Sequence, residues 1–441
     1  MTNRAVQLFF LFLFLFLGRC LALMRILYIA LFVTYFYTLL LPHAPAEENS
    51  ADLPWKVNKP IVTVQKGRYF PYPDQRSPVW IDMHYIGPDL ELLQIASSPY
   101  GDKLSRMEWR RSMDNGRTWS EFTPMVPSAS TVIYEGIEYT EYHGPRLDDE
   151  VAGVLLETWC RLNNNGFHTY YRLSWDRGVT WTTPKMLRYD EGEEFDPKNP
   201  VSEGYIHTNQ GYFGNNIIKL SNGTIVTVLG DANRNRGRRD SSLCFIARWN
   251  AAKKDYDWTP GKRVSIPRDK ASVLSEPEVV ELKDKRLLVV WRAEGTDTTP
   301  GRKYCSVSTD GGMTLSQPEE FKYDDGSSFY SPASFHRMVR SRANGKLYWL
   351  GNITAKPPGG RGMSYPRYPL VIAEVDESGP MPTLRKNTVT AIDDRQAHEP
   401  AGIEFSNFTL VQNRETHTLD LYMVVTGHSP TKNYKYIVTF Q

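Results

Sequence analysis

The sequence predicts an all-β protein that forms a single six-bladed β-propeller over residues 55–441. Three observations lead to this fold class. A short turn motif recurs about every 65 residues, the segments between the turns alternate apolar and polar residues, and no stretch after residue 55 has a helical period. A repeat of this length that holds several strands is typical of a propeller blade, and residues 55–441 have room for six of them.

The composition is that of a folded domain and excludes several other classes of protein. The 441 residues include 52 Lys and Arg against 50 Asp and Glu, so the net charge of +2 predicts no nucleic-acid-binding surface. A hydrophobic fraction of 41% is too high for a disordered chain, and four Cys are too few for a disulfide scaffold. Length alone favours two or three domains, but the repeat assigns nearly all of the chain to one.

Residues 1–46 are predicted to be an export signal that precedes the fold. Two apolar runs, 5–17 and 21–41, lead to Ala44-Pro45-Ala46, which has the small-x-small pattern of a signal cleavage site. The alternative is a retained N-terminal membrane anchor, because residues 21–41 are long enough to span a bilayer. In either case we expect the remaining chain to be exported, as a secreted, periplasmic or extracellular protein.

Export would leave three cysteines in the mature chain: Cys160, Cys244 and Cys305. Three thiols cannot all pair with one another, and none has the spacing of metal ligands. We therefore expect buried, unreactive thiols, no metal site and no cofactor.

The turn motif has the pattern Ser-x-Asp-x-Gly-x-Thr-Trp/Leu and begins at Ser112, Ser174 and Ser308. Degenerate copies begin at Ala247 and Ala373, so successive starts are 62, 73, 61 and 65 residues apart. In such a turn the Asp carboxylate accepts hydrogen bonds from its own loop, Gly takes the left-handed conformation, and the aromatic ring packs on the sheet. The motif therefore predicts a β-hairpin in each blade.

The ring is expected to close by pairing the two ends of the propeller. Residues 434–440 read as a last strand and residues 61–64 as a first strand, and joining them removes the open sheet edges.

The turns resemble the Asp-boxes, or BNR repeats, of the sialidase (neuraminidase) family. The resemblance implies a propeller whose innermost strands converge on a central channel that holds the site, with the boxes themselves serving a structural role. Polar residues recur at this inner position of the blades. Glu276, His336 and His143 occupy nearly the same place in their repeats, and Asn215 leads into the corresponding turn of another blade.

The fourth blade resembles sialidases most closely. Glu276-Pro277, followed by Trp291-Arg292 and the turn at Ser308, looks like their catalytic glutamate and a carboxylate-binding arginine. Arg367 looks like a second member of their arginine triad. An arginine binds a carboxylate through two parallel hydrogen bonds, and a buried glutamate can activate a hydroxyl. The alternative for Glu276 and Arg292 is a structural ion pair across two strands.

The match departs from the family at two points. The Arg-Ile-Pro segment that carries the remaining triad arginine is absent, with only Arg68 or Arg76 nearby. The position of the tyrosine nucleophile holds Phe405, which has no hydroxyl and cannot form a glycosyl-enzyme bond. Other hydroxyl donors in the chain are Tyr330, Tyr365 and Tyr212.

Residues 138–146 and 205–216 are rich in His, Tyr and Asn, side chains that suit proton transfer and sugar binding. They add His143, His207 and Tyr212 as candidate catalytic residues.

Three functions are compatible with these residues, and the first is favoured. A sialidase-like glycoside hydrolase would hold an anionic sugar with Arg292 and Arg367, and Glu276 would tune the nucleophile or act as base. A polysaccharide lyase would abstract the C5 proton of a uronate with His143 or His207, and Tyr212 would protonate the leaving oxygen. A non-catalytic carbohydrate-binding propeller is the third. Further predicted substrate contacts are His336, Asn215 and Tyr330.

Overall fold

The chain divides into two units, residues 1–52 and 53–441, and the computed structural model describes the second. Within it, residues 73–79, 101–102, 126–129, 135, 164–165, 191–194, 197, 200, 231, 233–238 and 428–430 are not described. The predicted signal or anchor over 1–46 therefore lies outside the described residues. Among the residues that are described, no helix combines the length and the apolarity needed to cross a bilayer.

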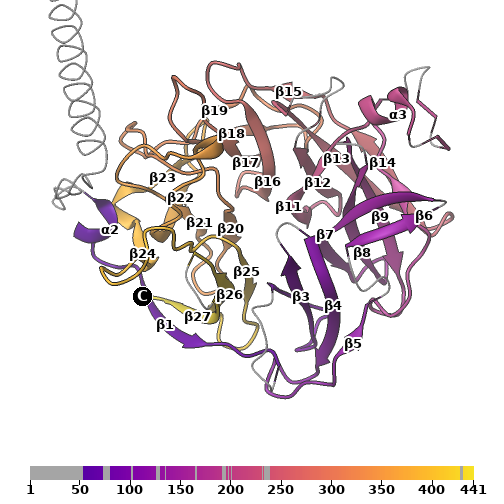
Figure 1. Cartoon of the computed structure of the whole chain (residues 1–441), viewed down its shortest axis with the longest axis horizontal. Coiled ribbons are helices and arrows are strands. Elements are labelled where there is room, and N and C mark those ends of the chain that lie inside the picture. Colours follow the sequence, from indigo (N-terminus) through magenta and orange to yellow (C-terminus); the bar gives the residue numbers. More distant parts are fainter. Residues whose placement is uncertain are drawn as a thin grey trace, which may run out of the picture. The chain divides into compact units, whose positions relative to one another are not determined.

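Residues 53–441 fold into six antiparallel sheets arranged as the blades of a β-propeller, as the repeat predicts (Figure 1). Blade one holds β2 (Trp80–Tyr85), β3 (Leu92–Tyr100), β4 (Lys103–Ser112) and β5 (Thr123–Pro124). Blade two holds β6 (Thr131–Tyr134), β7 (Ile137–Asp149), β8 (Val154–Asn163), β9 (Gly166–Ser174) and β10 (Lys185–Met186). Blade three holds β11 (Tyr212–Lys219), β12 (Ile225–Gly230), β13 (Ser241–Asn250), β14 (Asp255–Pro260) and β15 (Val264–Ser265).

The other three blades repeat this meander. Blade four holds β16 (Val273–Glu281), β17 (Leu287–Glu294), β18 (Lys303–Ser308) and β19 (Glu319–Glu320). Blade five holds β20 (Arg337–Arg340), β21 (Leu347–Asn352), β22 (Leu370–Asp376), β23 (Thr383–Leu384) and β24 (Thr390–Asp393). Blade six holds β25 (Phe408–Gln412), β26 (Leu419–Val425), β27 (Lys432–Phe440) and β1 (Val62–Arg68). Short helical turns are α2 (Pro54–Val57), α3 (Glu203–His207), η2 (Arg361–Met363) and η3 (Lys386–Thr388).

The predicted closure of the ring is confirmed. Strand β1 pairs antiparallel with β27 in a register that runs from Val62 opposite Phe440 to Arg68 opposite Tyr434. The first strand of the propeller is thus the outermost strand of the last blade, so strands from the beginning and the end of residues 53–441 close the ring within one sheet.

The three complete turn motifs share one hydrogen-bond pattern. In the first, Ser112 Oγ donates to Asp114 Oδ1 at 2.8 Å, and Thr118 donates to the same carboxylate from its backbone N and its hydroxyl. Gly116 has φ +83°, and the Trp119 indole N–H donates to the Gly116 carbonyl at 3.1 Å. The Ser, Asp and Thr contacts recur at residues 174–180 and 308–314. The loop contacts expected from the motif are therefore present.

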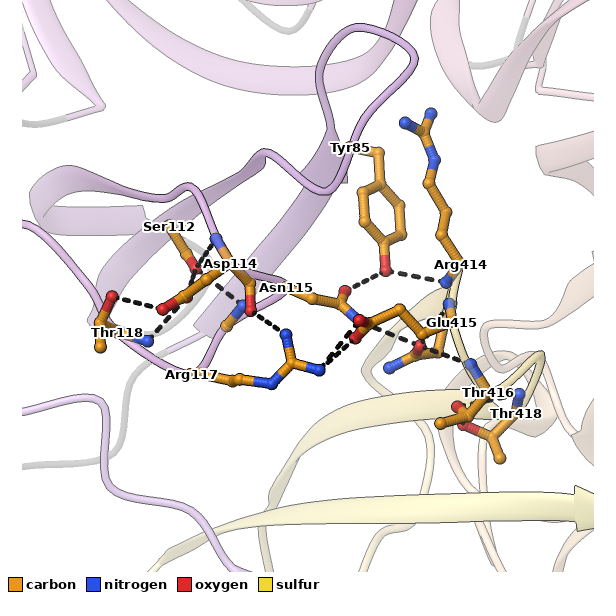
Figure 2. A network of polar contacts seen from close by, with 12 residues as sticks. Tyr85, Ser112, Asp114, Asn115, Arg117, Thr118, Arg414, Glu415, Thr416 and Thr418 are labelled. Carbon is orange, nitrogen blue, oxygen red and sulfur yellow. Dashed lines mark hydrogen bonds and ion pairs between the residues drawn. The ribbon is translucent and has the colours of Figure 1, made fainter.

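The first of these turns also joins blade one to blade six (Figure 2). Arg117 Nη2 lies 2.9 and 2.7 Å from the two carboxylate oxygens of Glu415, on the turn between β25 and β26. The Tyr85 hydroxyl donates to Asn115 and accepts a hydrogen bond from the backbone N of Arg414 at 3.0 Å. The ring is thus held at this junction by side chains as well as by the β1–β27 ladder.

Apolar side chains fill the space between neighbouring blades. Leu288 and Val290 of blade four pack with Trp349 and Val371 of blade five in one fully buried cluster, and similar clusters lie between other pairs of blades. Cys160, Cys244 and Cys305 are buried, as expected, and burial raises the pKa of the Cys244 thiol to about 12.

The innermost strands of three blades carry an irregularity at the same place. The pairing register shifts between His143 and Arg146 in β7, between Phe213 and Ile217 in β11, and between Ser275 and Glu278 in β16. A bulge bends a strand and re-aims its side chains. These three bulges lie where the inner strands meet the channel, so they decide which side chains enter it.

Candidate functional site

Two adjoining cavities lie along the inner strands. The arginine cavity has a volume of ≈ 500 Å³ and contains Glu276, Arg292 and Arg367. The deep chamber has a volume of ≈ 370 Å³, and its polar lining is Asp82, His84, His143, Arg146, Asn215, Asn216 and Arg337. Both cavities share the walls formed by Trp80, Ile81, Phe335, Phe408 and Thr409. They are therefore neighbouring sections of one channel.

The two cavities meet at neighbouring residues of the inner strands. On β7, Tyr142 lines the arginine cavity and residues 143–146 line the deep chamber; on β11, Tyr212 lines the first and residues 213–217 line the second. The lining changes from one cavity to the other within a single residue, so the cavities adjoin directly.

Glu276 and Arg292 meet in the arginine cavity. They extend from the adjacent strands β16 and β17, and Arg292 Nη1 donates to Glu276 Oε1 at 2.8 Å. The structure thus contains the cross-strand ion pair, and the second carboxylate oxygen of Glu276, Oε2, is buried without a hydrogen-bond partner among the described residues.

Arg367 lines the same cavity and is held in a similar way. Its Nη1 donates to Glu404 at 3.2 Å, and its Nε donates to the Ser364 carbonyl at 3.1 Å. A guanidinium has five N–H donors in a planar fork, so an arginine positioned by one carboxylate retains donors for another. Both predicted arginines are therefore brought together and pre-oriented.

A buried lysine that sequence reasoning missed lies beneath these arginines. Lys303 is fully buried on β18, opposite Arg292 in the strand register, and its Nζ donates to the carbonyls of Pro332 and Ser334 at 3.2 and 2.6 Å. Burial lowers the pKa of Lys303 well below its ordinary value, and the nearby Arg292 lowers it further. An isolated Lys in a strand gives no sequence signal for such a position.

Aromatic side chains form another wall of the arginine cavity. Tyr212 lies edge-on to Phe167 and to Tyr142, with ring centroids 5.5 and 6.1 Å apart, and all three rings line the cavity. Tyr212 therefore lies in the same cavity as Glu276, as its assignment as a catalytic residue requires.

The deep chamber contains a chain of charged contacts that joins two histidines. His84 Nε2 lies 2.8 Å from Asp82 Oδ2, which also accepts a hydrogen bond from Arg146 Nη1 at 3.0 Å. Arg146 Nη2 donates to Glu157, whose Oε1 lies 3.2 Å from His143 Nδ1. Each histidine is thus held by a carboxylate, and Arg146 connects the two pairs.

Neighbouring cations lower the pKa of both carboxylates, Asp82 and Glu157. Burial raises the pKa of Asp82, but His84, Arg146 and Arg337 lower it by more, so that the pKa falls well below its ordinary value. For Glu157, burial likewise raises the pKa, and Arg146 and Arg172 outweigh this effect. A carboxylate on Nδ1 orients a histidine so that Nε2 faces outward, and Nε2 of His143 has no hydrogen-bond partner among the described residues.

Three predicted site residues line neither cavity. His336 is 0% exposed, its Nε2 contacts the Val290 carbonyl at 3.2 Å, and burial lowers its pKa well below the ordinary value. His207 lies on α3 and pairs with Glu203 at 2.7 Å. Tyr330 packs against the Arg302 guanidinium, 4.1 Å from its ring centroid. The prediction of substrate contacts for His336 is therefore corrected, because its side chain, just before β20, is fully buried.

The structure also shows where the residues lie at which the sequence departs from sialidases. Phe405 is fully buried and lines neither cavity. Arg68 lies on β1, the outermost strand of blade six, with its guanidinium near the Tyr434 ring. Arg76 lies outside the described residues. Tyr365 is exposed beside Arg367, with its ring 5.4 Å from the guanidinium.

Asp82 and His84 are site residues that the sequence analysis missed. They are two apart on β2 and so share one face of the strand, and this alternation is visible in the sequence Trp-Ile-Asp-Met-His-Tyr. Within the described ranges, no group of three or more His, Cys, Asp or Glu is placed to hold a metal ion.

No protein-family model matches the chain, and no curated protein matches it. Solved structures with the same fold include a protein of unknown function from Dyadobacter fermentans, with a TM-score of 0.57, 13% identity and coverage of 87% of this chain and 100% of the other. The intramolecular trans-sialidase from Ruminococcus gnavus has a TM-score of 0.54 at 11% identity, with coverages of 85% and 97%. The NanB sialidase from Streptococcus pneumoniae has a TM-score of 0.53 at 12% identity, with coverages of 87% and 70%. At these identities the likeness shows the fold, which is the six-bladed β-propeller also found in sialidases.

Proposed function

We propose that this protein is an exported glycan-active enzyme that hydrolyses a glycosidic bond of an anionic, carboxylate-bearing sugar. One observation carries the proposal: Arg292, Arg367 and Glu276 line the same cavity. Two guanidiniums that line one cavity suit a planar carboxylate better than a neutral sugar, because each offers parallel N–H donors.

The proposed reaction uses the remaining groups of the arginine cavity. Since Phe405 replaces the family nucleophile, a water molecule is proposed to attack the anomeric carbon. Glu276 Oε2, which has no hydrogen-bond partner among the described residues, accepts the proton of that water. The Tyr212 hydroxyl, on the neighbouring blade, donates a proton to the leaving oxygen. Direct attack by water inverts the configuration at the anomeric carbon.

A polysaccharide lyase is the second candidate, and the His143–Glu157 contact favours it. A histidine held at Nδ1 by an ionised carboxylate is a positioned base at Nε2. In this reaction an arginine neutralises the uronate carboxylate, His143 removes the C5 proton, and Tyr212 protonates the leaving oxygen. No water is consumed, and the product contains a C4–C5 double bond.

One pair of assays separates these functions. The protein is incubated with sialosides and with uronate polysaccharides, and free sialic acid and the absorbance of unsaturated uronate are followed. The hydrolase predicts release of a saturated sugar without unsaturated product, and the reverse result supports the lyase. Activity that survives Arg292→Ala would contradict both, because both need the substrate carboxylate to be bound. The matched control is Arg248→Ala, an exposed arginine on β13 that should retain full activity.

If neither assay detects a product, the third candidate function, a non-catalytic propeller, is favoured. A carbohydrate-binding propeller would bind the anionic sugar without changing it, and Arg292→Ala would still abolish the binding.

A further inference from the structure

Lys303 is a buried basic side chain that the proposed reaction does not use. It lies on β18 opposite Arg292 on β17, and residues that face one another in an antiparallel pair project to the same side of the sheet. Leu288, Val290 and Arg292 alternate along β17, and the first two pack against blade five. Arg292 and Lys303 therefore both project toward blade five, which carries Arg367 just before β22.

The hydrogen bonds of Lys303 match an amine without charge. Nζ lies 3.2 Å from the Pro332 carbonyl and 2.6 Å from the Ser334 carbonyl, and no carboxylate of the described residues lies within ion-pair distance of it. A neutral amine has two N–H groups and one lone pair, whereas an ammonium has three N–H groups. The two carbonyls therefore satisfy every donor of the neutral amine, and the lone pair is left to accept a proton.

The charged and titratable groups around Lys303 come from four elements. Burial has the largest effect on the pKa of Lys303 and lowers it; Arg292 and Arg367 lower it further, and Glu276 raises it. His336, just before β20, is fully buried, and burial and Lys303 both hold its pKa well below the ordinary value. The surroundings of Lys303 thus disfavour its charged form.

The charges of the arginine cavity balance without Lys303. Arg292 pairs with Glu276 at 2.8 Å and Arg367 pairs with Glu404 at 3.2 Å, so two guanidiniums face two carboxylates. A substrate carboxylate adds one negative charge to this balanced set. Since a nearby negative charge favours the charged form of a lysine, protonation of Lys303 would restore the balance.

We propose that Lys303 is the third cation of the carboxylate site, and that it takes up one proton when an anionic sugar binds in the arginine cavity. The proton comes from solvent and bonds to the lone pair of Nζ, so an ammonium forms and no other bond changes. Lys303 lines neither cavity, and it is therefore a positioning residue that acts by its charge from behind Arg292. The inference rests on the proposed function, because it needs a ligand with a carboxylate, and it adds a proton to the binding equilibrium.

Isothermal titration counts this proton. The probes are N-acetylneuraminic acid and D-glucuronate, each titrated into the protein at neutral pH in buffers that differ in their enthalpy of ionisation. The dependence of the measured enthalpy on that of the buffer gives the number of protons taken up. For the wild type we expect uptake of about one proton, and an affinity that weakens by about tenfold for each unit by which the pH rises.

Lys303→Gln separates the charge from the hydrogen bonds. Its amide keeps two N–H donors for the carbonyls of Pro332 and Ser334 but cannot accept a proton at neutral pH. We expect this variant to bind the probe without proton uptake and with an affinity that stays constant over the same pH range. Lys322→Gln, at an exposed lysine just after β19, is the matched control and should take up the proton as the wild type does.

NMR of the side-chain nitrogens of lysine tests the wild type without a variant, which keeps the test decisive where Lys303→Gln does not fold. One lysine signal should move from the position of an amine to that of an ammonium when a probe binds. The proposal is overturned if a probe binds without proton uptake, if Lys303→Gln takes up the proton as the wild type does, or if no lysine signal moves. These outcomes leave the proposed function intact, whereas binding of neither probe would contradict both, because the site would then hold no carboxylate.

Discussion

The Glu276 carboxylate lies 2.8 Å from the Arg292 guanidinium, and the backbone that presents it has φ +44°. A non-glycine residue in this region costs about 1–2 kcal/mol, because Cβ approaches the carbonyl oxygen. A hydrogen bond holds this conformation: the Glu276 carbonyl accepts from Asn215 Nδ2 at 3.0 Å. The adjacent bulge interrupts the strand ladder at the same place. Backbone strain of this kind is concentrated at functional sites.

This strain predicts an unusual order of stability. Glu276→Gly should be more stable than Glu276→Ala by about 1 kcal/mol, since only glycine relieves the positive φ. Both variants should lose activity because both lack the carboxylate. The control is Glu281 at the end of the same strand, whose φ is not positive, where glycine should be the less stable substitution by about 0.5–1 kcal/mol. Urea unfolding measures all four variants, and the same order at both positions would contradict the argument.

The aspartates of the turn motifs predict that the stability of the fold depends on pH in the acid range. Hydrogen bonds from the Thr118 hydroxyl and backbone N, and from Ser112, lower the pKa of Asp114 to about 2. A depressed pKa stabilises the fold above the ordinary pKa of the carboxyl, 3.8, and this contribution is lost as the pH falls to about 2. Asp114→Ala should therefore lower Tm at neutral pH, and the difference from wild type should shrink between about pH 4 and pH 2. A constant difference across that range would argue against the carboxylate.

The raised pKa of Glu278 predicts the opposite dependence of stability on pH. Burial raises its pKa to about 7, although Arg337 lowers it in part. Between its ordinary value of 4.5 and about 7, the folded protein retains a proton that the unfolded chain releases, so stability falls as the pH rises through this window. Glu278→Gln removes the dependence. Relative to wild type, the free energy of unfolding of this variant should gain roughly 3 kcal/mol between pH 4 and pH 8. Parallel curves for the two proteins would refute this assignment.

Strand β27, which pairs with β1 to close the ring, is expected to be sensitive to substitution at its buried positions. Val438 on β27 is fully buried, in the cluster of apolar side chains that also includes Val62 and Leu419. Val438→Ala should lower the free energy of unfolding by about 2 kcal/mol, because it removes buried apolar surface and leaves a cavity. Thr439→Ala, at the exposed neighbouring position, should change it by less than about 0.5 kcal/mol. Equal effects at the two positions would show that this ladder does not bury a core.

The sequence by itself determined the repeat, the six blades and the pairing of the two ends. Each of these rests on local physics: alternation with period two, a carboxylate that bonds its own turn, and a glycine at positive φ. The same regularity located Glu276 and Arg292, because two strands joined by a short turn place their side chains together.

Only the tertiary structure decided which polar side chains face the channel. The Asp82–Arg146 contact joins residues 64 apart in sequence, and the Arg337–Asn215 contact joins residues 122 apart. Alignment of the blades by their turns placed His336 at the same position of the repeat as Glu276, yet His336 is fully buried and Glu276 lines a cavity. The reason is physical: a bulge or a small rotation of an inner strand turns a side chain from the channel into the blade, and these shifts depend on packing between blades that are distant in sequence.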